Sequence, residues 1–283
     1  MKVMITGAGG FVGRHLCQRL AADLEVVALK RGDLDITDRD AVFRRFAMAK
    51  PSLVINCAVI QVDECERNPN KAHAINVDGP RNLAEAAAES MIEFVHFGTN
   101  YAFSGRELGR MPYTIRDTPD PVNTYGRTKV AGETAVRKAC ASSYIIRTSW
   151  VYGHGKNSFL SSVHENLAGN RPVRAIRDVW ANTTLVQDLV GRVVDILIRR
   201  RYGTYHVVNA GVCSHYEFAL EAGRLLGLRK REVGKLIQAV NEEEMERVAA
   251  RPRYTPMHCL LAEEIGLTPM RHWRQALAAY LRS

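Results

Sequence analysis

Two residues that could move a proton stand four positions apart in the sequence Tyr125-Gly126-Arg127-Thr128-Lys129. On a helix this spacing puts both side chains on one face, so that the phenol and the ammonium group can converge. A phenol is a poor proton donor near neutral pH, and lowering its pKa from about 10 to about 7 takes about 4 kcal/mol, which a nearby ammonium group can help to supply. We therefore expect Tyr125 to donate a proton and Lys129 to lower the pKa of Tyr125.

A hydroxyl group at the end of an apolar run adds weight to this pair, which alone would be a common spacing. Residues 94–98 predict a strand, and Thr99 follows it at the edge where a substrate oxygen could be held. A strand-end cap or turn is the alternative role for Thr99. Together Thr99, Tyr125 and Lys129 predict acid–base chemistry on a substrate oxygen.

A glycine-rich loop, Gly7-Ala8-Gly9-Gly10-Phe11-Val12-Gly13, follows the first predicted strand and opens a helix. Gly7 and Gly10 would let the backbone approach a pyrophosphate, and Gly13 would let the helix pack closely on the strand. The first helical turn would then direct its N–H groups at the anion. The context predicts a dinucleotide bound by Gly7, Gly10, Phe11 and Val12, with the spacing GxxGxxG rather than GxGxxG.

The residues after the second predicted strand indicate which dinucleotide binds. A carboxylate there bonds the ribose of NAD and repels the 2′-phosphate of NADP. The strand ends instead in Lys30 and Arg31, which favours NADP(H) over NAD(H), while Asp33 keeps NAD(H) open. Further cofactor contacts are expected beside the adenine and after the third strand, from Asp35, Ile36, Cys57 and Ala58. Lys129 is also expected to hold a ribose hydroxyl.

Short β-branched runs alternate with helical patterns, which is typical of an α/β fold, a Rossmann-type doubly wound parallel sheet. The predicted strands cover residues 2–6, 25–29, 53–56, 94–98, 144–147 and 205–208, and the predicted helices cover 13–20, 80–90, 125–140, 159–168 and 186–199. We assign 1–150 to a dinucleotide-binding domain to which 184–217 returns, 151–183 and 218–270 to a smaller C-terminal substrate-binding lobe, and 271–283 to a terminal helix. The lobe would lie over the carboxyl ends of the strands, where open α/β sheets bind ligands.

The composition argues against several classes of protein. No uninterrupted apolar run reaches the about 18 residues of a membrane span, and the first residues are typical of a strand rather than a leader, so we expect a cytoplasmic protein without a membrane partner. A net charge of +9 favours an anionic partner, but the basic runs lack aromatic neighbours, so nucleic acid is not expected. The six cysteines are scattered, and Glu242-Glu243-Glu244 is expected to face solvent, so no metal site is expected. Whether the chain forms a homodimer stays open.

Longer motifs extend across the chain, from the glycine loop to Trp273-Arg274-x-Ala276-Leu277. They include Thr99-Asn100-Tyr101-Ala102-Phe103, Arg147-Thr148-Ser149-Trp150-Val151-Tyr152-Gly153 and Gly203-x-Tyr205-His206. With the TGxxGxxG loop and the YxxxK pair, these motifs make the chain resemble the extended short-chain dehydrogenase/reductase family. Within that family it is most similar to the dTDP-4-dehydrorhamnose reductases.

This resemblance implies an oxidoreductase of dTDP-L-rhamnose biosynthesis that uses NADPH to reduce the C4 keto group of a dTDP-4-keto-6-deoxy sugar. Thr99 would bond the keto oxygen, and Tyr125 would protonate the resulting alkoxide. Trp150 would pack near the sugar, with a place in the core as its alternative role. Asn157 is expected as a further contact to this nucleotide-sugar substrate, and Arg177 and Arg251 as ligands of its diphosphate.

Two stretches depart from the family pattern. The usual Asp-Gln-x-Gly-x-Pro-Thr is Asp178-Val179-Trp180-Ala181-Asn182-Thr183-Thr184 here, and the usual Ser-Thr-Asp-Tyr-Val-Phe is Gly98-Thr99-Asn100-Tyr101-Ala102-Phe103. The sugar and its nucleotide therefore stay open. So do two other functions: an epimerase or dehydratase that retains NAD, against which Lys30 and Arg31 argue, and a regulatory NADP-binding subunit resembling the methionine adenosyltransferase β-subunit, against which Trp150 argues.

Overall fold

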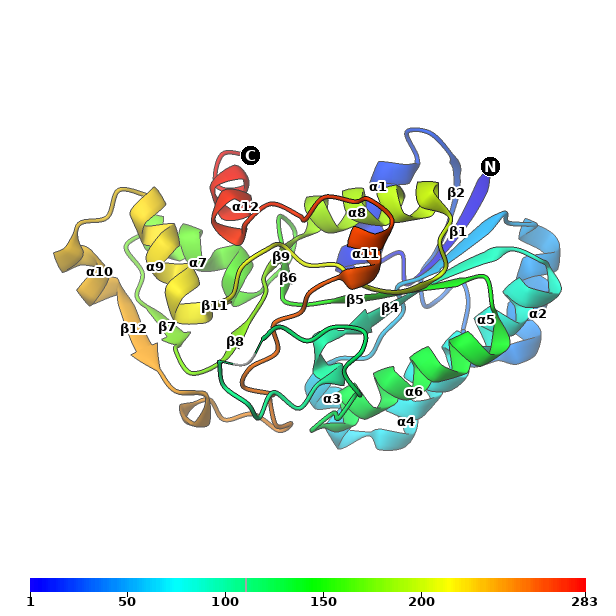
Figure 1. Cartoon of the computed structure of the whole chain (residues 1–283), viewed down its shortest axis with the longest axis horizontal. Coiled ribbons are helices and arrows are strands. Elements are labelled where there is room, and N and C mark those ends of the chain that lie inside the picture. Colours follow the sequence, from blue (N-terminus) through cyan, green and yellow to red (C-terminus); the bar gives the residue numbers. More distant parts are fainter. Residues whose placement is uncertain (110) are drawn as a thin grey trace.

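The computed structural model describes residues 1–109 and 111–283, and within them a six-stranded parallel sheet forms the centre of the molecule. Its strands are β1 (Lys2–Thr6), β2 (Glu25–Leu29), β3 (Leu53–Asn56), β4 (Glu93–Thr99), β5 (Ser143–Thr148) and β10 (Gly203–His206). Their order is β10-β5-β4-β3-β1-β2 (Figure 1). The middle strands are mostly apolar and buried, as in β3, in which every residue is buried, because helices cover both faces of the sheet.

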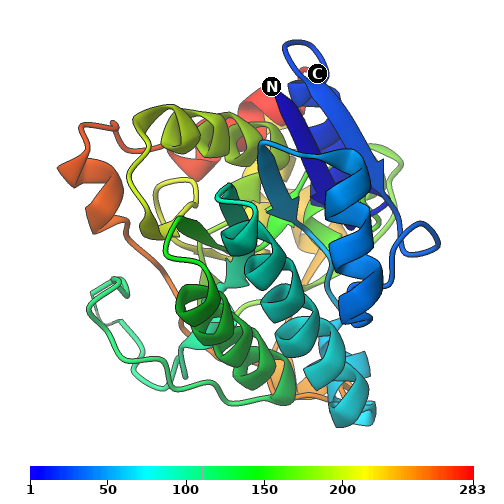
Figure 2. The ribbon, with the colours of Figure 1, turned by 90° about the vertical axis from the view of Figure 1, so that its right-hand side faces the viewer.

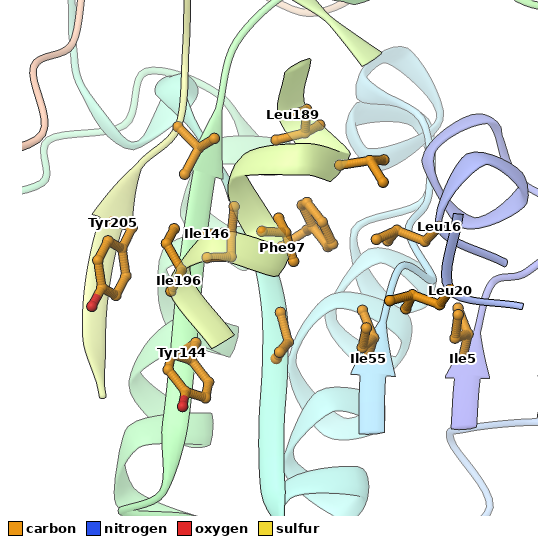
Figure 3. Close-up of a cluster of buried hydrophobic side chains, with 14 of the residues drawn as sticks. Ile5, Leu16, Leu20, Ile55, Phe97, Tyr144, Ile146, Leu189, Ile196 and Tyr205 are labelled. Atoms are coloured by element: carbon orange, nitrogen blue, oxygen red, sulfur yellow. The ribbon is translucent and has the colours of Figure 1, made fainter. Parts of the chain in front are cut away.

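Two layers of helices enclose this sheet. On one face, α1 (Phe11–Leu20) packs beside α8 (Val186–Arg199), and on the other face α5 (Gly79–Glu89) lies between α2 (Arg39–Ala49) and α6 (Thr124–Ala139) (Figure 2). Figure 3 shows the core under the first pair, in which helix and strand side chains meet: Leu16, Leu189, Ile196, Ile5, Ile55 and Ile146. The confirmed fold class is therefore the α/β, Rossmann-type doubly wound sheet expected from the sequence.

Smaller elements complete the chain. After β3 come α3 (Val62–Arg67), α4 (Pro69–His73) and the π-helix η1 (Ala74–Asp78), and the 3-10 helix η2 (Asn100–Ala102) follows β4. A second cluster of elements, at the left of Figure 1, consists of α7 (Phe159–Ala168), α9 (His215–Leu225), α10 (Lys230–Leu236), α12 (Trp273–Tyr280) and the strand pairs β6 (Val151–Tyr152) with β9 (Thr184–Leu185), β7 (Val173–Ile176) with β12 (Ile237–Val240), and β8 (Trp180–Ala181) with β11 (Cys213–Ser214). The 3-10 helix η3 (Glu242–Glu244) and α11 (Leu260–Glu264) lie between β12 and α12.

The elements expected from the sequence agree closely with those observed. The expected strands 2–6, 25–29 and 53–56 are β1, β2 and β3, and the expected helices 159–168 and 186–199 are α7 and α8. The strand expected at 205–208 is β10, which begins two residues earlier and pairs with β5. The division into two domains remains a prediction. In the part of the chain that the structure describes, no helix is long and apolar enough to cross a membrane.

Candidate active site

The glycine loop passes close to the backbone that follows β3. Gly7 has φ of +66°, and a Cβ atom there would lie 2.5 Å from the amide nitrogen of Ala58, so only glycine fits. The amide of Gly10 donates to the carbonyl of Gly7 over 2.9 Å, and α1 begins at Phe11. The first turn of α1 contains no acidic residue, and Gly10 provides no side-chain cap. Its N–H groups therefore suit a pyrophosphate, and the loop fits the dinucleotide expected from the sequence.

The segment after β2 exposes two cations, and its two carboxylates accept hydrogen bonds from neighbouring residues. Lys30 and Arg31 are exposed. The carboxylate of Asp33 accepts a 2.8 Å hydrogen bond from the amide of Lys30, and that of Asp35 accepts bonds from the amide and the hydroxyl of Thr37, which hold the pKa of Asp35 below its usual value. This arrangement suits a 2′-phosphate better than a ribose hydroxyl.

The three remaining cofactor candidates on this side differ in accessibility. Ile36 is only 6% exposed and packs against Gly79 in the core between β1, α2 and α5, so its side chain contributes to that core. Cys57 and Ala58 are partly buried, and the amide of Cys57 donates to the carbonyl of Thr6. Burial raises the pKa of the Cys57 thiol, so the thiol stays protonated and presents a neutral surface beside the glycine loop.

Three local contacts fix the start of α6, which carries the proposed proton donor. Asn123 caps the helix by accepting a 2.8 Å hydrogen bond from the amide of Gly126, and its own amide group donates to the carbonyl of Ala250. Gly126 lies so close to the carbonyl of Tyr101 that no Cβ atom would fit between them. Helix α6 is therefore held against η2 and against the C-terminal part of the chain.

Thr99 and Tyr125 meet at the carboxyl end of β4, and Lys129 donates to the carbonyl of Phe97 on the same strand. A hydrogen bond between Thr99 and Tyr125 lowers the pKa of the phenol, but burial raises it further, to about 12. In the chain by itself, the pKa of Tyr125 thus shifts in the opposite direction to the one expected from Lys129, because the loss of water around the phenol outweighs the hydrogen bond. Burial also lowers the pKa of Lys129, to about 8.

A row of buried polar groups extends behind Lys129. Its ammonium group donates to the carbonyl of Phe97 and lies 3.4 Å from Nε2 of His96. On the far side of the imidazole, Nδ1 of His96 lies 3.2 Å from Nδ2 of Asn56, whose carbonyl oxygen accepts a 2.8 Å bond from the hydroxyl of Thr6. These groups connect α6 to β4, β3 and β1 through side chains alone.

A buried ion pair anchors α6 one turn further along. Arg147 on β5 donates to Glu133 over 2.7 Å, and neither side chain is more than 5% exposed. Gly98 lies beside this pair, where any side chain would collide with the Glu133 carboxylate. The pair therefore fixes the rotation of α6 and, with it, the direction in which Lys129 points.

The proposed substrate residues lie in several places. Trp150 has φ of +38° and packs its ring 4.3 Å from that of His215. Asn157 is exposed, and Arg177 is exposed and donates to the side chain of Asn241. Arg251 is mostly buried and pairs with Asp63 on α3 over 2.9 Å, so its charge is already matched within the chain.

A family model described as the RmlD substrate binding domain matches residues 1–283. The chain belongs to the RmlD substrate binding domain family. The resemblance to dTDP-4-dehydrorhamnose reductases stated from the motifs is thereby confirmed.

Relatives of this RmlD-family chain are similar over nearly its whole length. A dTDP-4-dehydrorhamnose reductase of Mycolicibacterium smegmatis is 40% identical over 98% of the chain and 84% of that protein. The spore coat polysaccharide biosynthesis protein SpsK of Bacillus subtilis is 37% identical over 99% of the chain and 97% of that protein. The crystal structure of dTDP-4-dehydrorhamnose reductase from Bacillus anthracis in complex with NADP has 30% identity, a TM-score of 0.92, and coverage of 99% of this chain and 98% of that one.

Sequence reasoning did not identify every polar group of this RmlD-family site. Motif spacing does not single out His96, although a histidine inside the apolar run Phe94-Val95-His96-Phe97 is itself a signal, because a buried imidazole needs partners. The spacing of Glu133 from Lys129 is ordinary on a helix surface, so the sequence does not mark Glu133 as a site residue. Only the packing of β5 against α6 turns that side chain inward.

Proposed function

We propose that this chain reduces the C4 keto group of a dTDP-4-keto-6-deoxy sugar with NADPH. The observation that carries the proposal is the hydrogen bond between Thr99 and Tyr125 at the end of β4, the strand that also anchors Lys129, in a chain similar throughout to relatives named dTDP-4-dehydrorhamnose reductase. The NADP in the related Bacillus anthracis structure and the exposed Lys30 and Arg31 support the choice of cofactor.

The chain's own side chains would divide the work around the reacting carbonyl. The bound cofactor supplies a hydride. The Thr99 hydroxyl holds the keto oxygen, and Tyr125 gives its phenol proton to that oxygen as negative charge develops on it. Lys129 stabilises the phenolate left behind and holds a ribose hydroxyl. The proton is thus delivered from a partly buried phenol rather than from bulk water.

Binding roles follow from the same placement. Gly7, Gly10, Phe11 and Val12 would hold the pyrophosphate at the start of α1, and Lys30 and Arg31 the 2′-phosphate. Asp35, the backbone of Ile36, Cys57 and Ala58 would border the adenine and the path to the nicotinamide. Trp150 and Asn157 would contact the sugar nucleotide. Arg177 would bind its diphosphate more readily than Arg251, because Asp63 already matches the charge of Arg251.

The proposal is tested by following oxidation of NADPH with enzymatically prepared dTDP-4-keto-6-deoxy-L-mannose, in parallel with NADH. We expect oxidation that depends on the sugar, consumes NADPH in proportion to it, and is slower with NADH. Conversion of the sugar without net loss of NADPH would indicate an epimerase instead. Binding of NADPH with no reaction on any keto sugar, and co-purification with an adenosyltransferase, would indicate a regulatory subunit. Light scattering on the same sample tests whether the chain forms a homodimer.

A further inference from the structure

Lys129 contacts a second titratable side chain that no step above uses. His96 lies on β4 with 0% of its surface exposed, and its Nε2 is 3.4 Å from Nζ of Lys129. Burial, and then the charge of Lys129, holds the pKa of His96 well below its usual value, so the imidazole is neutral. A neutral imidazole carries one proton, on Nδ1 or on Nε2, and the choice decides what Lys129 meets.

The hydrogen bonds of Asn56 determine where that proton is. The backbone amide of Ala58 can only donate, and it lies 3.0 Å from one end of the Asn56 carboxamide, so that end is the oxygen. The hydroxyl of Thr6 donates to the same oxygen over 2.8 Å. The other end, the NH₂ group, therefore faces Nδ1 of His96 at 3.2 Å and donates to it. Nδ1 is an acceptor, and the proton of His96 is on Nε2.

We propose that His96 is a positioning residue whose Nε2–H, fixed by Asn56, faces Nζ of Lys129 and favours the neutral amine over the ammonium. A neutral amine can donate to the carbonyl of Phe97 and still accept from Nε2–H. An ammonium group has no lone pair, so it would place a donor against a donor. The catalytic consequence, a lysine that exchanges its proton near neutral pH, rests on the proposed function.

The other groups facing Lys129 act in the opposite direction. Glu133 on the same helix, Cys57 after β3 and Cys65 on α3 each raise the pKa of Lys129, and burial outweighs them. Tyr125, one turn earlier on α6, is neutral because burial raises the pKa of its phenol. His96 is thus the neighbour whose hydrogen bond adds to the effect of burial.

The substitution His96→Asn separates this role from a structural one. An asparagine oxygen can replace Nδ1 as the acceptor for Asn56, but the side chain ends before the position of Nε2. We expect the alkaline limb of the pH profile of kcat/KM to move upward by about one pH unit, because the Lys129 ammonium is no longer opposed by a donor. The matched control is His164→Asn, a partly buried histidine on α7 whose ring contacts Tyr280, for which the limb should not move. An unmoved limb in His96→Asn overturns the proposal.

Two readouts do not depend on reductase activity. Nitrogen-15 NMR of histidine-labelled wild-type protein should show His96, identified by its absence from His96→Asn, as the neutral Nε2–H form, and an Nδ1–H form overturns the proposal. If the chain does not reduce the sugar, the pH dependence of the unfolding free energy replaces the kinetic profile. As the pH rises from about 8 to 10.5, the free energy of unfolding should increase more in wild type than in His96→Asn, because Lys129 loses its proton at lower pH in the wild-type fold. Equal increases in the two proteins overturn the proposal.

Discussion

Nη2 of Arg251 donates to both carboxylate oxygens of Asp63, over 3.0 and 2.9 Å, and so ties the C-terminal part of the chain to α3. The Arg251 side chain is only 8% exposed. We expect Arg251→Ala to lower the free energy of unfolding by about 2 kcal/mol, because a partly buried carboxylate loses its charged donor. Urea unfolding measures this loss. Arg229→Ala is the control, since its ion pair with Glu232 lies at the surface, and equal losses in both variants would contradict the prediction.

The same ion pair predicts a dependence on pH. Burial alone would raise the pKa of Asp63, but hydrogen bonds from Ala249 and Arg251 outweigh burial and lower it. A carboxyl group with a lowered pKa stabilises the fold above the usual aspartate pKa of about 4 and loses this effect as the pH falls. The difference between wild type and Arg251→Ala should therefore shrink in acid. A constant difference down to the acid transition would exclude Asp63 as its source.

Tyr125→Phe removes only the proposed proton donor. We expect turnover to fall at least about 100-fold while the dissociation constant for NADPH stays within a few-fold of wild type, since general acid catalysis contributes factors of this size. Single-turnover kinetics and cofactor fluorescence measure the two quantities. Tyr202→Phe serves as the control, because that phenol bonds Glu93 at the opposite end of β4. Near-normal turnover in Tyr125→Phe would remove this residue from the mechanism.

The ammonium group of Lys129 should lower the free energy of unfolding at neutral pH. Burial lowers its pKa from 10.5 to about 8, so below pH 8 the fold holds an ammonium group that the unfolded chain leaves in water. The cost disappears as the pH rises from about 8 past 10.5, where both states lose the proton. Lys129→Met should abolish turnover yet raise the unfolding free energy at pH 7 by up to about 3 kcal/mol.

This gain in Lys129→Met should decrease above pH 8, and denaturant unfolding at several pH values checks the trend. Lys138→Met is the control, because Lys138 is exposed in the last turn of the same helix. If the gain were independent of pH, it would come from packing of the methionine rather than from the charge of Lys129.

Local patterns predict the sheet and the three central site residues, whereas the remainder depends on contacts between distant segments. The strands β1 and β3 are mostly apolar, and the glycine loop forms within eight residues, so both can be recognised from neighbours in sequence. By contrast, β7 pairs with β12 more than sixty residues away, and each strand has only four residues, too few for a clear period. The protonation of Lys129 depends likewise on His96 and Asn56, which only the sheet brings together.

Lys30 and Arg31 should determine the choice between NADPH and NADH. Both are exposed at the end of β2, where a 2′-phosphate would accept charge-assisted hydrogen bonds. Each change, Lys30→Ala or Arg31→Ala, should lower kcat/KM for NADPH by about 10- to 100-fold relative to that for NADH. Arg19→Ala removes an equal charge from α1, away from the end of β2, and should leave the ratio unchanged. A constant ratio in all three variants would mean that neither Lys30 nor Arg31 binds the 2′-phosphate.

Trp150 combines an unfavourable backbone conformation with a large side chain, which suggests that its position serves the substrate. Its φ of +38° costs about 1 to 3 kcal/mol for a residue of this kind, and glycine would remove that cost. Trp150→Gly also loses the ring contact with His215. We expect these effects on stability to offset each other to within about 2 kcal/mol, while KM for the sugar nucleotide rises at least about 10-fold.

Lys50→Gly is the matched control for Trp150→Gly, because Lys50 has φ of +48° at the exposed end of α2. It should gain about 1 kcal/mol of stability and leave KM unchanged, since glycine relieves the same backbone strain far from the site. Unfolding curves and KM measured for both variants distinguish the two roles of Trp150. An unchanged KM together with a loss of about 3 to 5 kcal/mol in Trp150→Gly would mean that the ring belongs to the core and not to the substrate site.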